Sequence, residues 1–192
     1  THVAQRIARS LPIGLTLYVK EHPSMAGRRP LRFYQKLRSL PNVRMIHPHH
    51  DSHQLIKGAR LVVTVTGTAG LEGLLFNKPT ITLGKAYYNK LETVENVRSI
   101  DELDSAIPRV LATYQPDEMR VLDFVAATFE GSVAANYQYL WHAPGGFDEI
   151  WRHPDLAPLV RLTAAEMRLP GAEPLNPDRA DATLKVSASG SG

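Results

Sequence analysis

Two short stretches of the chain hold residue types that suit the binding of a phosphate. The first is Thr66-Gly67-Thr68-Ala69-Gly70, which places two hydroxyls and two glycines directly after a β-branched run. Hydroxyls can donate hydrogen bonds to phosphate oxygens, and glycines let a phosphate approach the backbone. The first amides of a following helix carry partial positive charge. The stretch therefore predicts an anion site, with a plain connection between strand and helix as the alternative.

The second stretch is His22-Pro23, which follows an apolar run that ends near Lys20. The proline favours an extended, fixed turn, so the imidazole is expected at the end of a strand. A histidine there can donate to a phosphate, or stabilise the charge on a departing phosphate. His22 is therefore the candidate catalytic residue. The alternative is that His22 is only a polar strand end in contact with a backbone carbonyl.

Glu72 lies within the first turns of the helix that is expected after the Thr66–Gly70 stretch. A carboxylate in that place could accept hydrogen bonds from the hydroxyls of a ribose. The alternative is that Glu72 is favoured there only by the helix dipole.

Four histidines follow one another over seven residues, beside Asp51: His47, His49, His50 and His53. Their spacing does not match a zinc pattern, so no metal site is predicted. Asp51 or Ser52 is expected to cap the next helix. His49 or His50 could flank a nucleotide base.

The roles of two further pairs of neighbouring residues cannot be decided from the sequence alone. Arg28 and Arg29 are solvated loop residues, or they reach an anionic sugar. Tyr87 and Tyr88 close over a ligand, or they pack at the sheet edge.

Alternating apolar runs predict the elements that must position these residues. Strands are expected at Ile13–Val19, Val43–Ile46, Leu61–Val65, Thr80–Leu83 and Asn96–Ile100. Helices are expected at Val3–Leu11, Leu31–Leu40, His53–Gly58 and Gly70–Phe76, at a segment capped by Ser99 or Asp101, and at Pro116–Phe129. The alternation predicts an α/β fold with a doubly wound parallel sheet and a helical C-terminal extension. Such sheets bind ligands at the carboxyl ends of their strands, so the two phosphate-binding stretches are expected at one edge.

Composition narrows the class of protein. The chain has 192 residues, 43% of them apolar, no cysteine and a formal net charge of +3. The absence of cysteine excludes disulfides and thiolate metal sites, and the weak dispersed charge does not predict nucleic-acid binding. No run of about 18 apolar residues predicts a membrane span. The motifs of common hydrolases, metalloproteases, P-loop enzymes and dinucleotide dehydrogenases are missing from the sequence.

Three regions are expected along the chain: a nucleotide-binding domain at 1–115, helices that pack on it at 116–153, and an extension at 154–192 that is disordered from about residue 170. The first residue is threonine, not methionine. We therefore expect the chain to be a piece of a longer protein.

The motifs together resemble a known family. They are Tyr-Val-Lys-Glu-His-Pro at 18–23, the stretch from Leu55 to Gly84 that contains Thr-Gly-Thr-Ala-Gly-Leu-Glu, and Ala-Tyr-Tyr at 86–88. This pattern resembles the capsule polysaccharide biosynthesis family, which includes Kdo transferases, and more broadly the C-terminal, donor-binding domain of GT-B glycosyltransferases. The His-Pro motif is also similar to that of bacterial sialyltransferases, where it contacts the phosphate of a CMP-sugar. Their hydroxyl motif more often has adjacent hydroxyls, whereas Gly67 here separates Thr66 from Thr68.

The resemblance implies a Rossmann-like domain of a cytoplasmic glycosyltransferase, with peripheral association at the inner face of the membrane left open for the full-length protein. The donor would be a nucleotide-sugar, with a CMP-sugar favoured, and the acceptor a saccharide or glycolipid. No metal or other cofactor is required. An N-terminal domain, absent from this chain, would supply the acceptor site, so the chain alone is expected to be inactive. The donor would be held by Lys20, His22, Thr66, Gly67, Thr68, Ala69, Gly70 and Glu72.

Two alternatives remain beside the transferase. One is half of an enzyme like the nucleotide-sugar 2-epimerases, which should show further acid/base carboxylates, of which only Glu72 is well placed. The other is a non-catalytic nucleotide-binding or interaction domain.

Overall fold

A computed structural model of the chain describes residues 2–134 and 156–167. The chain divides into two compact units, residues 1–124 and 125–192. The predicted boundaries at 115 and 153 stay predictions. The predicted tail from about residue 170, and most of a helix expected at 132–141, lie outside the described residues.

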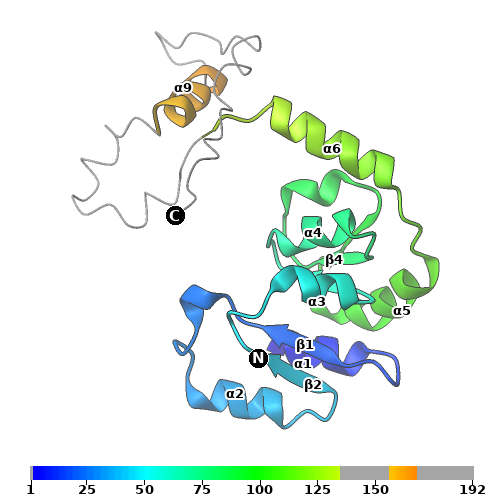
Figure 1. Cartoon of the computed structure of the whole chain (residues 1–192). Coiled ribbons are helices and arrows are strands. Elements are labelled where there is room, and N and C mark those ends of the chain that lie inside the picture. The colour runs from blue at the N-terminus through cyan, green and yellow to red at the C-terminus, as the bar shows by residue number, and fades with distance from the viewer. Residues whose placement is uncertain (1, 135–155, 168–192) are drawn as a thin grey trace, which may run out of the picture. The chain divides into compact units, whose positions relative to one another are not determined.

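The first unit alternates strands and helices, and its elements can be followed by colour in Figure 1. The strands are β1 (Leu17–Lys20), β2 (Val43–Ile46), β3 (Val62–Thr64), β4 (Thr80–Thr82) and β5 (Val94–Asn96). The helices that begin in this unit are α1 (His2–Ser10), α2 (Leu31–Arg38), α3 (Ser52–Gly58), α4 (Ala69–Leu75), α5 (Leu103–Thr113) and α6 (Glu118–Glu130). Three 3₁₀ turns lie between them: η1 (Pro23–Met25), η2 (Tyr87–Lys90) and η3 (Ile100–Glu102).

The strands form parallel sheets, which confirms the predicted α/β class. In one sheet β1 pairs with β2, so that Leu17 lies opposite Val43. In the other, β4 lies between β3 and β5, and Thr80 lies opposite both Val62 and Val94. Hydrogen bonds thus divide the strands into a two-stranded and a three-stranded sheet.

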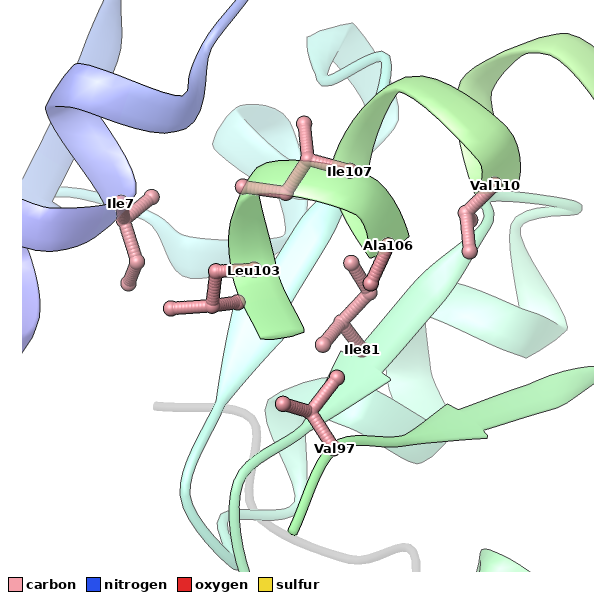
Figure 2. Packing of buried hydrophobic residues seen from close by; sticks show 7 residues of the cluster. All are labelled: Ile7, Ile81, Val97, Leu103, Ala106, Ile107 and Val110. Atoms are coloured by element: carbon pink, nitrogen blue, oxygen red, sulfur yellow. The ribbon is translucent and has the colours of Figure 1, made fainter. Parts of the chain in front are cut away.

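Helices cover both faces of the three-stranded sheet, as in a doubly wound fold. On one face Ile81 of β4 packs against Leu103, Ala106 and Ile107 of α5, in a cluster that also holds Ile7 of α1 (Figure 2). On the other face lies α4, since a Cβ on Gly73 would approach Thr80 Oγ1 to 2.9 Å and Val62 Cγ2 to 3.0 Å. Leu17 of β1 packs both against this first cluster and against the cluster of Ala8, Leu37 and Val43. The two sheets therefore share a continuous core.

Two predicted strands differ from the observed ones by more than one residue at an end. The first strand was expected from Ile13, but it begins at Leu17. Leu15 N–H donates to Pro12 O at 3.2 Å, and Gly14 has a φ of +91°. These residues form a turn that the apolar run conceals. The fifth strand was expected at Asn96–Ile100, but it spans Val94–Asn96.

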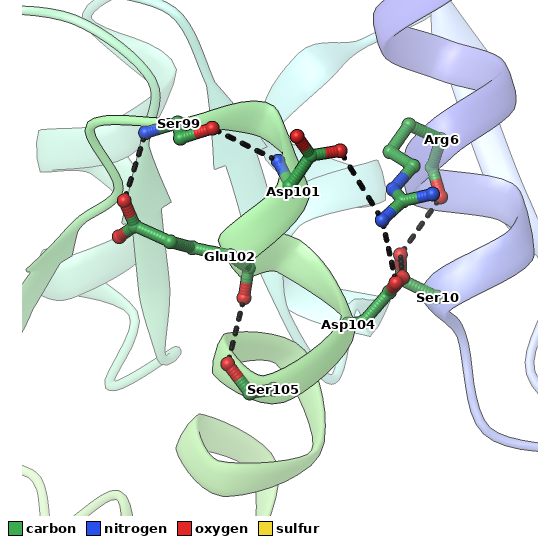
Figure 3. Close-up of polar contacts among 7 residues, drawn as sticks. All are labelled: Arg6, Ser10, Ser99, Asp101, Glu102, Asp104 and Ser105. Atoms are coloured by element: carbon green, nitrogen blue, oxygen red, sulfur yellow. Dashed lines mark hydrogen bonds and ion pairs between the residues drawn. The ribbon is translucent and has the colours of Figure 1, made fainter.

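The end of that fifth strand is set by a helix cap. Ser99 Oγ accepts from Asp101 N–H at 3.3 Å, and Ser99 N–H donates to Glu102 Oε1 at 3.0 Å (Figure 3). This reciprocal pair is a capping box, which begins the η3–α5 segment before a longer strand can form. Asp51 Oδ1 similarly accepts from His53 N–H at 2.8 Å, so Asp51 is the cap of α3.

A polar contact joins α1 to α5 beside the shared core. Asp104 accepts from Arg6 Nη2 at 2.6 Å and from Ser10 Oγ at 2.5 Å (Figure 3). Asp101 lies 3.4 Å from the same guanidinium, and its side chain is 80% exposed. Asp104 therefore accepts hydrogen bonds from the buried Ser10 hydroxyl and from the Arg6 guanidinium, whereas Asp101 contacts only the guanidinium.

We expect Asp104→Ala to lower the free energy of unfolding by about 1–2 kcal/mol, because it removes two hydrogen bonds and leaves Ser10 with a weaker partner. Asp101→Ala is the matched control, with an expected change below about 0.5 kcal/mol for an exposed pair. Urea unfolding followed by circular dichroism measures both. Equal losses in the two variants would show that the contact with Ser10 contributes nothing.

Candidate functional site

The hydroxyl-rich turn lies where the sequence predicts it, between the end of β3 and the start of α4. Thr66, Gly67 and Thr68 are exposed, Ala69 is half-buried, and Gly70 is buried. Gly67 N–H donates to Thr64 Oγ1 at 3.1 Å, and Gly70 N–H donates to Gly67 O at 3.2 Å. Two of the turn's amides are therefore used within the turn. The Thr66 hydroxyl and the amides of Thr68 and Ala69 at the start of α4 are what the turn can offer to a ligand.

Tyr88 supports this turn through a hydrogen bond to its backbone. Its side chain is 0% exposed, and its hydroxyl donates to Gly67 O at 2.5 Å. A Cβ added to Gly70 would lie 2.8 Å from Tyr88 Cζ, so the ring occupies the space that a side chain at position 70 would need. Gly70 thus serves close packing. Neighbouring Tyr87 is 52% exposed, and its ring stacks on Phe124 at 6.0 Å. The two adjacent tyrosines therefore play different parts, which the sequence did not distinguish.

A polar network around buried Thr82 fixes the segment that carries Tyr88. Thr82, which is 0% exposed, donates to Asn89 Oδ1 at 2.9 Å and accepts from Asn96 Nδ2 at 3.0 Å. Asn89 Nδ2 and Asn96 Nδ2 also donate to Gly84 O, at 2.8 and 3.0 Å. Sequence reasoning missed these residues, because no local spacing links three side chains from β4, η2 and β5.

Glu72 lies on α4, and the structure brings it together with Thr68. Thr68 Oγ1 donates to Glu72 Oε1 at 3.1 Å, and Glu72 N–H donates to Thr68 O at 3.0 Å. The Glu72 side chain is 29% exposed, so its carboxylate stays open to solvent. On its other side, Glu72 Oε2 lies 3.5 Å from His53 Nε2. The sequence did not predict this pair, since the two residues belong to different helices.

His22 lies on the loop after β1, where it caps η1. Its Nδ1 accepts from Ser24 N–H at 3.2 Å and lies 2.7 Å from Ser24 Oγ. Because Nδ1 accepts from a backbone amide, the neutral ring carries its proton on Nε2. The exposed His22 ring therefore presents an N–H donor. Lys20 ends β1 opposite Ile46, and it is half-buried.

Glu21, between these two residues, fixes the same loop. Its side chain is 9% exposed, and it accepts from Arg29 Nε and from Tyr34 OH, both at 2.9 Å. Burial, followed by the hydrogen bond and the charge of Glu21, raises the pKa of Tyr34. The Arg29 guanidinium also lies 4.8 Å from the centre of the Phe33 ring. Arg29 is thus a structural residue of this loop, while Arg28 is exposed.

The predicted residues therefore fall into two groups. Thr66–Gly70 and Glu72 lie together on the β3–α4 connection, and Lys20 and His22 lie on the loop after β1. Among the described residues, no hydrogen bond, ion pair or ring contact joins the two groups. Each group follows the carboxyl end of a parallel strand, which is where α/β sheets place ligands.

His47, His49 and His50 are held by local contacts. The rings of His47 and His49 lie 5.6 Å apart, and His50 Nδ1 lies 3.0 Å from Asp51 O. Within residues 2–134 and 156–167, no three histidine, aspartate or glutamate side chains are grouped so that they could hold a metal ion.

A surface depression of about 400 Å³ lies elsewhere, beside β5, α5 and the start of α6. Its lining includes Glu92, Thr93, Tyr114 and Arg120. Burial raises the pKa of Tyr114, and hydrogen bonding to Glu92 raises the pKa of Arg120. None of the predicted site residues lines it.

The parallel α/β fold and the hydroxyl-rich turn define a Rossmann-like domain, and comparison with known proteins places it in a family. The model of the capsule polysaccharide biosynthesis protein family matches residues 1–96, which is half of the chain. The chain belongs to this family.

A relative and a search for structures complete the comparison. The chain is 35% identical over 104 residues to Protein FixF of Sinorhizobium fredii (strain NBRC 101917 / NGR234). This match covers 52% of the chain and 23% of that protein, so the chain spans less than a quarter of the relative's length. No solved structure matches the chain. Within the described helices, none combines the length and the apolar character needed to cross a bilayer.

Proposed function

We propose that this chain is the donor-binding portion of a glycosyltransferase of capsule or surface polysaccharide synthesis. The donor is a nucleotide-sugar, with a CMP-sugar favoured, and the acceptor is a saccharide or glycolipid. The observation that carries the proposal is the exposed Thr66–Thr68 turn at the end of β3, held by buried Tyr88 and flanked by Glu72. Membership of the capsule polysaccharide biosynthesis family supports a role in the synthesis of capsule or surface polysaccharide.

The chemistry of sugar transfer explains the residue types. The bond between the anomeric carbon and the phosphate oxygen breaks, and the nucleotide leaves with that electron pair. An acceptor hydroxyl forms the new bond to the anomeric carbon and loses its proton to a base. The leaving phosphate gains negative charge, so donors fixed around it accelerate the reaction.

This chain's residues take the donor side of that reaction. In the proposal, His22 is the catalytic residue and donates from Nε2 to the departing phosphate, while Lys20 adds positive charge. The Thr66 hydroxyl and the amides of Thr68 and Ala69 hold the phosphate, because the Gly67 and Gly70 amides are bonded within the turn. The Thr68 hydroxyl holds Glu72, and Glu72 accepts from the ribose. Nothing in this scheme calls for a metal ion. The acceptor and the base come from an N-terminal domain of the longer protein, which works in the cytoplasm or at the inner face of the membrane.

Calorimetric titration of the chain with CMP, UDP and GDP tests the donor site. We expect one of these nucleotides to bind, and His22→Asn and Thr66→Val to weaken its binding at least about tenfold, because each removes a donor to a charged phosphate. Asparagine keeps the cap on η1 through its side-chain oxygen, but its amide nitrogen is bonded directly to Cγ and so ends one atom short of the place of Nε2; valine keeps the volume of threonine. His2→Asn changes an exposed histidine of α1, outside the site, in the same way as His22→Asn, and it is expected to bind like the wild type.

The titration also separates the alternatives. A folded chain that binds none of the three nucleotides would contradict the proposal and favour a non-catalytic interaction domain. Binding that survives both substitutions would contradict the assignment of the phosphate site.

A further inference from the structure

His53 is an exposed residue that the proposed donor chemistry does not use, yet it is held in a defined place. It lies in α3, the helix between β2 and β3, and its side chain is 62% exposed. Its ring meets that of Phe76 edge to face, with centroids 6.0 Å apart. One turn further along α3, Lys57 Nζ lies 4.9 Å from the centre of the same Phe76 ring.

These contacts define how α3 and α4 face each other near the donor turn. His53 and Lys57 are four residues apart on α3, so they share one helix face. Glu72 and Phe76 are likewise four residues apart, Glu72 within α4 and Phe76 as the residue that ends it. The packing of this face on Phe76 directs His53 Nε2 toward Glu72 Oε2, at 3.5 Å.

Glu72 is therefore held on both of its oxygens. Thr68 Oγ1 donates to Oε1 at 3.1 Å, and the imidazole of His53 faces Oε2. An ionised carboxylate has about four acceptor positions, so each oxygen keeps one free for a ligand. A carboxylate held at two points can present these positions to two neighbouring hydroxyls without first losing rotamer freedom.

We propose that His53 is a positioning residue for Glu72, and that this pair selects nucleotides that carry both ribose hydroxyls. The inference rests on the proposed function, because it names the element of that site which reads the ribose. His53 acts through Glu72: its imidazole fixes the carboxylate oxygen that accepts from the sugar ring of the nucleotide.

The test compares the affinity of CMP with that of 2′,3′-dideoxy-CMP, using UDP and its dideoxy form if UDP is the nucleotide that binds. We expect the wild-type chain to prefer the ribonucleotide by about tenfold, which is the effect of one hydrogen bond to a charged group. His53→Phe keeps the ring against Phe76 but has no N–H, and it should reduce the preference to less than about threefold. His53→Gln can still donate to Glu72 and should restore it.

Lys57→Ala is the matched control, since it alters the same helix face and the same Phe76 contact without touching Glu72. It should keep the wild-type preference. Glu72→Gln should lose the preference, as His53→Phe does. Urea unfolding of each variant reports any loss of fold separately.

The outcomes distinguish this inference from the proposed function. If the wild-type chain binds none of CMP, UDP and GDP, both fail. If it binds a ribonucleotide and the dideoxy form of that nucleotide equally well, only this inference fails. If the ribonucleotide binds with the full preference in His53→Phe, the proposed function stands and the role of His53 is wrong. If Lys57→Ala loses the preference as His53→Phe does, general packing of α3 on α4 explains the effect, and the specific role of His53 is again overturned.

Discussion

Tyr88→Ala should lower the free energy of unfolding by about 3–5 kcal/mol, the range for removing a buried aromatic ring. The side chain is 0% exposed and belongs to the cluster of Leu74, Leu91, Val94 and Val121. The same substitution removes the donor to Gly67 O, so the hydroxyl-rich turn loses its support. Urea unfolding measures the loss of stability, and nucleotide titration at a temperature where the variant is folded measures the loss of the site.

Two neighbouring substitutions separate the parts of this effect. Tyr88→Phe removes only the hydroxyl and should cost about 1–2 kcal/mol. Tyr87→Ala removes an adjacent tyrosine that is half exposed and should cost clearly less than Tyr88→Ala. Similar losses for Tyr87→Ala and Tyr88→Ala would contradict the different parts that the structure assigns to them.

The pH dependence of stability gives a second measurement on the same residue. Burial, and then the neighbouring Tyr87, raise the pKa of Tyr88 above its ordinary value of 10.0. As pH rises, the Tyr88 hydroxyl loses its proton in the unfolded chain before it does so in the folded chain. The contribution of neutral Tyr88 to the free energy of unfolding is therefore complete below about pH 10 and decreases above it. We expect the alkaline loss of stability to be smaller in Tyr88→Phe, which has no group to ionise.

Gly70→Ala should destabilise the chain by about 1–3 kcal/mol, as expected for an added methyl group in a packed site. The new Cβ would lie 2.8 Å from Tyr88 Cζ, and any shift of this buried ring would disturb its hydrogen bond to Gly67 O. This cost exceeds the roughly 1 kcal/mol that alanine gains over glycine in a helix. Displacement of Tyr88 should also weaken nucleotide binding, because the same ring holds Gly67.

Gly58→Ala is the control, since Gly58 ends α3 and no heavy atom lies within 4 Å of the position that the new methyl group would take. It should be neutral or slightly stabilising. A double-mutant cycle with Tyr88→Ala then tests the cause: if the ring is what the methyl group meets, Gly70→Ala should cost much less once the ring is absent. An unchanged cost in that background would show that the strain lies elsewhere.

Local sequence patterns determined much of the fold, because their causes lie within a few residues. The strand at Val43–Ile46 was predicted with the bounds that the structure has. The cap of α3 was predicted to be Asp51 or Ser52, and the structure shows Asp51, whose hydrogen bond joins residues two apart. Parallel pairing followed from the alternation of strands and helices. The family also followed from the sequence, since the motifs that carry it are contiguous.

What the tertiary structure alone decided are the partners of the site residues. Tyr88 and Gly67 are 21 residues apart, and His53 and Glu72 lie on different helices, so no spacing predicts either contact. Such pairs depend on strand register and on helix packing, which are set by the burial of many side chains together. The start of β1 was missed for the opposite reason: Gly14 makes a turn, but the apolar residues around it look like a strand. The sequence thus predicts which residues bind a phosphate, and tertiary packing decided which others hold these residues in place.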